Sequence, residues 1–166
     1  MKKWLLAAGF LAAFGLGYGF RAITRSEKLG PRATGIGGIF FKTKDPAAMK
    51  KWYAQYLNIR IVQSGSIFEW WQGADSTKKG FTFWAPFKET TKYFQPSEKE
   101  FMINYRVEGL EALLAKMKAA GIMPVDSVQR TGYGNFVHLM DPDGNKIELW
   151  EPDDAGLAKD GTVTSK

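Results

Sequence analysis

Hydrophobic and polar residues alternate in several short runs of the chain, and alternation with a period of two is typical of a β-strand with one buried face. Many of the hydrophobic residues in these runs are β-branched or aromatic, and turn residues separate the runs. From this pattern we predict strands at residues 36–43, 58–64, 66–71, 80–87, 101–107, 123–130, 135–140 and 146–150.

Two longer runs instead repeat hydrophobic residues at helical spacing. The first helix is predicted to begin at Pro46, with Asp45 as its N-cap, and to end near Leu57. The second is predicted to end at Gly121, which suits a C-cap. The stripes expected to face the core are Met49, Trp52, Tyr53 and Tyr56 in the first helix, and Leu110, Leu113, Leu114 and Met117 in the second.

The sequence Asp-Pro-Asp-Gly-Asn at residues 141–145 predicts a tight turn between the last two strands. Proline fixes φ, glycine accepts a positive φ, and Asp and Asn side chains bond to nearby backbone N–H groups. Alternation after the turn places Ile147 and Leu149 on one face and Glu148 on the other, between a lysine and a tryptophan. The first face is predicted to join the core, and the second to line a site.

The chain repeats the element order βαβββ on either side of a charged connector at residues 88–100. In the two copies Phe40 corresponds to Asn104 and Lys42 to Arg106, and each first strand runs directly into its helix. Neither copy can bury a sheet face alone. We therefore predict an α+β domain in which two βαβββ modules form one curved mixed sheet, with the helices on the convex side and a cleft on the concave side.

The paired modules and the ending Asp-Pro-Asp-Gly-Asn-Lys-Ile-Glu-Leu at residues 141–149 resemble the vicinal oxygen chelate superfamily. That superfamily includes glyoxalase-like proteins, bleomycin-resistance-like proteins and ring-cleaving dioxygenases. The resemblance covers residues 35–152 and implies the glyoxalase/bleomycin-resistance-like fold. It leaves the function open, because this fold hosts isomerases, lyases, dioxygenases and non-catalytic binders.

The resemblance also implies where a metal ion would be bound, with one ligand from the first and one from the last strand of each module. Those positions are Gly38 and Met102 in the first strands, and Glu148 in the last strand of the second module. The fourth position is Thr82 or Trp84, depending on the alignment of the two copies. Only Glu148 is a good ligand for a divalent cation. We therefore expect no cofactor, with a divalent metal as the alternative.

The predicted cleft contains side chains from both modules. Lys42 and Arg106 occupy equivalent positions, so the two modules would bring two cations together, with aromatic walls beside them. A small anionic or aromatic molecule is the expected ligand. The predicted ligand-binding residues are Phe40, Lys42, Trp84, Asn104, Arg106, His138 and Trp150, with Glu148 as the candidate catalytic residue.

Structural roles compete with these assignments. Glu148 could simply pair with Lys146 or Arg106, and a lone histidine such as His138 is more often a packed, hydrogen-bonded residue than a base. Three functions remain open: a metal-free small-molecule binder, an enzyme of the lyase, isomerase or dioxygenase type that uses Glu148, and a non-catalytic module that dimerises. The third is favoured if Lys42 and Arg106 point away from any pocket.

Composition narrows the class of protein. The chain has 166 residues, enough for one well-filled core, and a net charge of +6 whose charges are dispersed along the sequence. No nucleic-acid-binding motif is present, so no nucleic-acid partner is expected. The chain contains no cysteine, which excludes disulfides, thiolate metal sites and cysteine nucleophiles.

The N-terminus predicts a location. Lys2 and Lys3 precede an uncharged run from Trp4 to Phe20, and Arg21 follows it. We expect residues 1–20 to be a hydrophobic helix that anchors the protein in a membrane, with a cleaved signal peptide as the alternative. Residues 21–34 are predicted to be a linker and residues 153–166 a loose tail. The domain is expected to be exported, either membrane-anchored or secreted.

Overall fold

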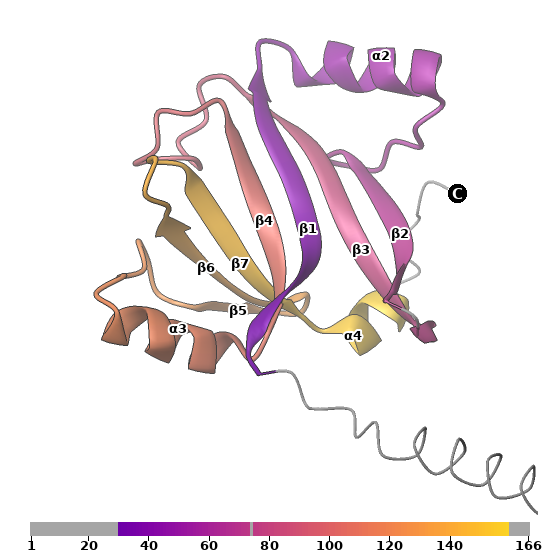
Figure 1. The fold of residues 1–166 in the computed structure, drawn as a ribbon. Helices are drawn as coiled ribbons and strands as arrows, with labels where there is room; N and C mark the ends of the chain where they lie inside the picture. The colour runs from indigo at the N-terminus through magenta and orange to yellow at the C-terminus, as the bar shows by residue number, and fades with distance from the viewer. Residues whose placement is uncertain (1–29, 74, 160–166) are drawn as a thin grey trace, which may run out of the picture. The chain divides into compact units, whose positions relative to one another are not determined.

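The computed structural model describes residues 30–73 and 75–159. Figure 1 shows these residues as one curved sheet with short helices at its margins. The elements are β1 (Arg32–Thr43), α2 (Pro46–Leu57), β2 (Ser66–Gln72), β3 (Asp75–Lys88), β4 (Phe101–Glu108), α3 (Leu110–Ala119), β5 (Gln129–Thr131), β6 (Gly134–Met140), β7 (Lys146–Pro152) and α4 (Asp154–Lys159).

The seven strands lie in the order β2-β3-β1-β4-β7-β6-β5. In each module the first strand pairs in parallel with the last, as β1 with β3 and β4 with β7. The last strand of each module also forms an antiparallel hairpin, β2 with β3 and β6 with β7. The two modules meet where β1 pairs antiparallel with β4. The predicted α+β class and the single sheet built from two modules are therefore confirmed.

The predicted N-cap of α2 and the predicted last turn form as expected, whereas the C-cap of α3 is Ala120, and Gly121, with a φ of 81°, directly follows it. Asp45 Oδ1 accepts hydrogen bonds from the backbone N–H groups of Ala47 and Ala48, at 2.9 and 3.0 Å, and α2 begins at Pro46. In the last turn Asp141 Oδ1 accepts from the backbone N–H groups of Asp143 and Asn145. These local bonds satisfy donors that would otherwise be unpaired, so the sequence alone determines them.

Four predictions about local structure are wrong. Residues 58–64 form no strand, because the chain turns back and Val62 and Gly65 bond to each other. Of the strand predicted at 123–130, only residues 129 and 130 are in a strand, as the first two residues of β5. The backbone N–H of His138 donates to the Asp126 carboxylate, so it is not available for a strand-to-strand hydrogen bond. Strand β3 begins at Asp75, five residues before the start predicted for it at residue 80. Of the tail expected at 153–166, residues 154–159 form helix α4, which buries Leu157, and residues 160–166 lie outside the described residues.

The two long helices, α2 and α3, differ in how far they pack against the sheet. In the second module Leu110 and Leu114 of α3 are buried against a cluster from the strands. In the first module α2 buries no residue, and Trp52 is 50% exposed and Tyr56 62%. The prediction that Trp52 and Tyr56 face the core is wrong, because α2 lies beyond the end of β1 rather than over the sheet (Figure 1).

The predicted membrane helix at residues 1–20 lies outside the described residues. Within residues 30–73 and 75–159 no helix is both long enough and apolar enough to cross a membrane. Strand β1 begins at Arg32, so the last residues of the predicted linker already belong to the sheet.

Candidate functional site

A row of residues crosses the inner, concave face of the sheet from one module to the other. Gly38 pairs with Asn104, Asn104 with Glu148, and Glu148 with His138. Paired residues of neighbouring strands project from the same face. Three polar side chains from β4, β7 and β6 therefore lie side by side, and each is at most 2% exposed.

Both carboxylate oxygens of Glu148 are engaged. Asn104 Nδ2 donates to Oε1 at 2.6 Å, and the Tyr93 hydroxyl donates to Oε2 at 2.5 Å. His138 Nε2 lies 2.8 Å from Oε2, although its direction is poor for a hydrogen bond. The other ring nitrogen, Nδ1, lies 2.6 Å from Oδ2 of Asp126. The imidazole is thus held between two carboxylates.

Burial and hydrogen bonding act in opposite directions on Glu148. Burial alone would raise the pKa of this carboxyl, but the adjacent His138 imidazole and the hydrogen bonds from Tyr93 and Asn104 lower it below its usual value. Burial, and next the charge of Glu148, raise the pKa of the Tyr93 phenol. Glu148 is therefore held as a buried anion, and Tyr93 as a neutral donor to it.

The simple pairings considered for Glu148 are not formed. Lys146 Nζ donates to the backbone carbonyl of Tyr93 at 2.7 Å and lies 5.3 Å from the centre of its ring. Burial lowers the pKa of Lys146, opposed by the nearby charges of Asp126 and Glu148. Arg106 forms an ion pair with Asp154 instead. The donors that do surround Glu148 include Tyr93, which sequence reasoning missed because it lies in the connector, where no periodicity marks an inward-facing side.

The two cations predicted to converge each have a carboxylate partner. Lys42 Nζ lies 3.4 Å from Oε1 of Glu100. Arg106 forms a two-pronged pair with Asp154 of α4, in which Nη1 is 2.8 Å from Oδ1 and Nη2 contacts Oδ2. The predicted tail residue Asp154 thus neutralises the buried guanidinium. No pair of unneutralised cations is available here to hold an anion.

Aromatic rings do line the inner face, though not all those predicted. Phe40 lies edge-on to Phe87, whose ring stacks on Tyr93 with 5.6 Å between centroids. Trp150 is 1% exposed and stacks on Phe136, so it is core rather than a free wall. The prediction for Trp84 is wrong. Its partner across β1 is Ile39, one position away from Gly38, so its indole lies on the outer face.

The positions implied for a metal ion do not fit one. A Cβ on Gly37 would lie 2.2 Å from Asn104 Oδ1, and one on Gly38 would lie 2.6 Å from the Phe40 ring, so no ligand side chain has room on this part of β1. Met102 offers only a buried thioether. In the described part of the chain no three His, Asp or Glu residues are grouped to hold a metal ion. Glu148 is the only suitable ligand, and its oxygens are already bonded.

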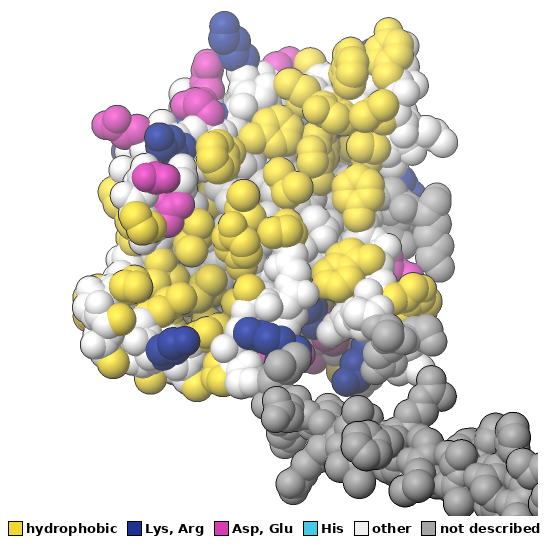
Figure 2. Space-filling view, in the orientation of Figure 1, with side chains coloured by type: hydrophobic (Ala, Val, Ile, Leu, Met, Phe, Trp, Pro, Cys, Tyr) yellow, Lys and Arg dark blue, Asp and Glu magenta, His cyan; other side chains and the backbone are white. Residues whose placement is uncertain are grey.

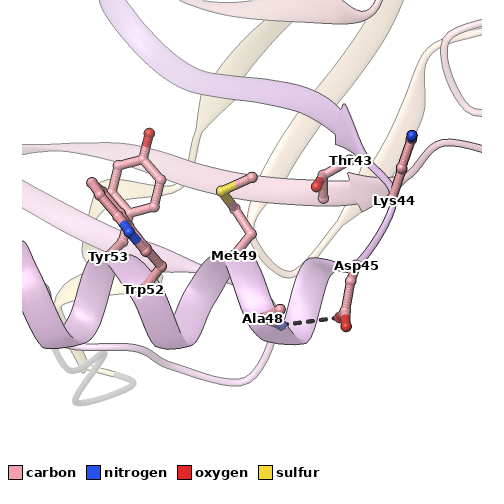
Figure 3. Close-up of a pocket in the computed structure, with 7 residues that line it drawn as sticks. All are labelled: Thr43, Lys44, Asp45, Ala48, Met49, Trp52 and Tyr53. Carbon is pink, nitrogen blue, oxygen red and sulfur yellow. Dashed lines mark hydrogen bonds between the residues drawn. The ribbon is translucent and has the colours of Figure 1, made fainter.

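A second candidate site lies away from this row. A groove of about 560 Å³ opens between the end of β1 and the first turns of α2 (Figure 3). Trp52 and Tyr53 form one end of it and Lys44 the other. Its full lining is Thr43, Lys44, Asp45, Ala48, Met49, Trp52 and Tyr53. None of the residues predicted to bind a ligand contributes to this groove.

Comparison with known proteins identifies the architecture. The family model for the Glyoxalase/Bleomycin resistance protein/Dioxygenase superfamily matches residues 35–149. A search of curated proteins gave no match. Among solved structures, a Streptomyces coelicolor methylmalonyl-CoA epimerase in complex with 2-nitronate-propionyl-CoA is 16% identical, with a TM-score of 0.55, over 74% of this chain and 99% of its own. A catechol 2,3-dioxygenase is 20% identical, with a TM-score of 0.50, over 73% of this chain and 42% of its own. At these identities the likeness concerns the fold alone.

Proposed function

The chain belongs to the Glyoxalase/Bleomycin resistance protein/Dioxygenase superfamily, also called the vicinal oxygen chelate superfamily, and within it we propose a metal-independent binding protein. Its ligand is a small neutral aromatic molecule that carries a hydroxyl group. The proposed site is the inner face of the second module, around Glu148. Tyr93 occupies this site when the ligand is absent.

The observation that carries the proposal is the environment of the Tyr93 phenol. Its ring stacks on Phe87, with an interplanar angle of 1°, and stands edge-on to His138 at 5.3 Å. Its hydroxyl donates to a carboxylate that is held charged. Aromatic stacking combined with one charge-assisted hydrogen bond is the recognition expected for a phenol. A free phenol could therefore make the same contacts.

Tyr93 is also placed where it can move out of the site when a ligand binds. It lies in the connector between β3 and β4 and is 39% exposed, although its hydroxyl reaches a buried group. Loops move more readily than the strands they join. Inside the site Asn104 Oδ1 is buried and has no hydrogen-bond partner in the described part of the chain. A ligand that carries a second donor group could satisfy this acceptor, which the resting structure does not.

The charges favour a neutral ligand over an anionic one. Glu148 and Asp126 place two carboxylates around His138, and the nearby cations Lys42 and Arg106 are paired with Glu100 and Asp154. The same charges disfavour the enzymatic alternative. A carboxylate with a lowered pKa is a weak base, and each oxygen of Glu148 already accepts a hydrogen bond.

The test is calorimetric titration with p-cresol, which is a tyrosine side chain without its backbone. We expect wild-type protein to bind p-cresol, and Tyr93→Ala to bind it more tightly because the internal competitor is gone. Toluene lacks the hydroxyl and should bind about tenfold to a hundredfold more weakly, since a hydrogen bond to a charged group contributes about 1.5–3 kcal/mol.

The control variant is Tyr133→Ala, which removes another half-exposed tyrosine outside the site and should bind p-cresol like wild type. Two results would contradict the proposal. One is p-cresol binding by Tyr93→Ala with none by wild type, which would make Tyr93 a permanent structural plug. The other is equal affinity for p-cresol and toluene, which would leave Glu148 without a role in recognition.

A further inference from the structure

We propose that α2 and the outer face of the first module rest on the surface of an anionic membrane. This inference is independent of the proposed ligand site, which lies on the other face of the sheet. It begins with large hydrophobic side chains that are exposed on α2 and on β1. They are Trp52, Tyr56 and Leu57 from α2, and Ile36 and Ile39 from β1. In Figure 2 hydrophobic side chains lie over α2 and the neighbouring strands, and also over other parts of this face.

The exposure on α2 is not compensated by packing within the chain. None of its residues is buried, whereas the equivalent helix α3 buries two leucines. The aromatic rings of α2 instead contact one another. Trp52 lies 5.2 Å from Tyr56 and 5.1 Å from Tyr53, and only Tyr53 reaches the sheet, at Trp84. A helix whose aromatic side chains face solvent has a free surface for a partner.

The polar residues around these rings indicate the kind of partner. Lys44 and Lys51 lie at or before the first turns of α2, and the helix itself contains no acidic residue. Lys50 Nζ instead donates to the backbone carbonyl of Gln63. The nearest carboxylate, Asp45, is engaged as the N-cap. Trp, Tyr and Lys together are typical of a membrane–water interface with anionic lipids. Protein–protein interfaces, in contrast, are depleted in lysine, which disfavours a second copy of the chain.

The sequence outside the described residues supplies the second argument. The uncharged run from Trp4 to Phe20 is predicted to enter a membrane, and residues 21–30 connect it to the sheet. Ten residues can span about 35 Å at most, and the twelve residues of β1 extend about 40 Å. A connection of at most about 35 Å would keep the first residues of β1 within that distance of the membrane, which makes contact between this face and the lipid feasible.

The absence of cysteine allows a direct test in the full chain, because a single introduced cysteine can carry a nitroxide label. The informative site is Gln55→Cys on α2, and the matched control is Ala115→Cys on α3, both at exposed positions. The protein is reconstituted in vesicles of equal parts phosphatidylcholine and phosphatidylglycerol. Accessibility of the label is then measured to dioxygen, which dissolves in lipid, and to a water-soluble nickel complex.

We expect the label at position 55 to become accessible to dioxygen and shielded from nickel, while the label at position 115 stays open to water. Trp52→Glu combined with Tyr56→Glu should return position 55 to water, while the protein stays on the vesicles through its N-terminus. Both side chains are at least half exposed, so the fold should survive, as circular dichroism can confirm. Lys51→Gln should lower the ratio of lipid-bound to water-exposed label about fivefold.

Three results would overturn the proposal. The first is equal accessibility to nickel at positions 55 and 115. The second is a lipid-like signal at position 55 that survives the double glutamate variant. The third is shielding at position 55 accompanied by spin–spin coupling between labels, which would show that a second copy of the chain covers this face.

Discussion

The outer faces of the two modules differ although the modules share one element order. In the second, α3 covers the sheet and buries Leu110 and Leu114 against Val107, Leu139 and neighbouring residues. In the first, α2 extends past the end of β1 and leaves its own aromatic rings half exposed. One copy thus uses its helix to build the core. The other leaves its helix free, and we propose a membrane as its partner.

The inner faces differ in the opposite sense. The first module contributes hydrophobic side chains, among them Ile67, Phe81 and Phe83. The second contributes Asn104, His138 and Glu148, which are fully buried and lie side by side, with Asn104 hydrogen-bonded to Glu148. A duplicated fold can therefore keep its backbone while one copy holds the polar site and the other supplies surface and packing.

The largest expected effect comes from breaking the polar row. Glu148→Ala should lower the free energy of unfolding by about 3–5 kcal/mol, because the Tyr93 hydroxyl and the Asn104 amide lose their acceptor in a buried place. Denaturant unfolding followed by circular dichroism measures this. Glu98→Ala, at an exposed position, should change the unfolding free energy by less than about 0.5 kcal/mol. Equal losses of unfolding free energy in the two variants would contradict the claim that Glu148 is buried and hydrogen-bonded.

The second-largest expected effect is a difference in stability loss between substitutions on α3 and on α2. Leu114→Ala on α3 should cost about 2–5 kcal/mol, since it leaves a cavity among buried residues. Trp52→Ala on α2 should cost less than about 1 kcal/mol despite removing a larger side chain, because half of that side chain is already in water. Thermal unfolding of both variants without membranes measures the difference. A larger loss from Trp52→Ala would mean that α2 is part of the core.

A smaller effect should appear in acid. The pKa of Glu148 is lower in the folded protein than in the unfolded chain, so the unfolded chain binds this proton first as the pH falls. The stability that Glu148 contributes is complete above its ordinary pKa of 4.5 and is lost as the pH drops through the folded value. Urea midpoints measured from about pH 6 to about pH 3 should fall less steeply for Glu148→Gln than for wild type.

Local signals in the sequence predicted much of this fold. Asp45 and Pro46 place the start of α2, and the turn at residues 141–145 places the last hairpin, because each acts through bonds to its own neighbours. Helix α4 was missed because its support is not local. Asp154 is held by Arg106 of β4, and Leu157 by the inner face of the sheet, and neither contact appears in the sequence near residue 154.

The candidate site was predicted only in part, for the same reason. Strand alternation correctly placed Glu148 and Asn104 on one face, and the pairing of β4 with β7 brings them together. Trp84 was assigned to the wrong face, because a shift of one residue reverses a strand. Tyr93 and Asp126 reach the site from segments without periodicity, so their positions depend on tertiary packing alone.

The most direct test of the central claim is an NMR titration of the Glu148 carboxyl carbon. The claim is that this carboxylate is held as a buried anion that accepts hydrogen bonds from Tyr93 and Asn104 and lies beside the His138 imidazole. We predict a pKa below its ordinary value of 4.5, and a higher pKa in Tyr93→Phe, which lacks one donor. A pKa above the ordinary value would show that burial prevails, and would restore Glu148 as a candidate proton-transfer group.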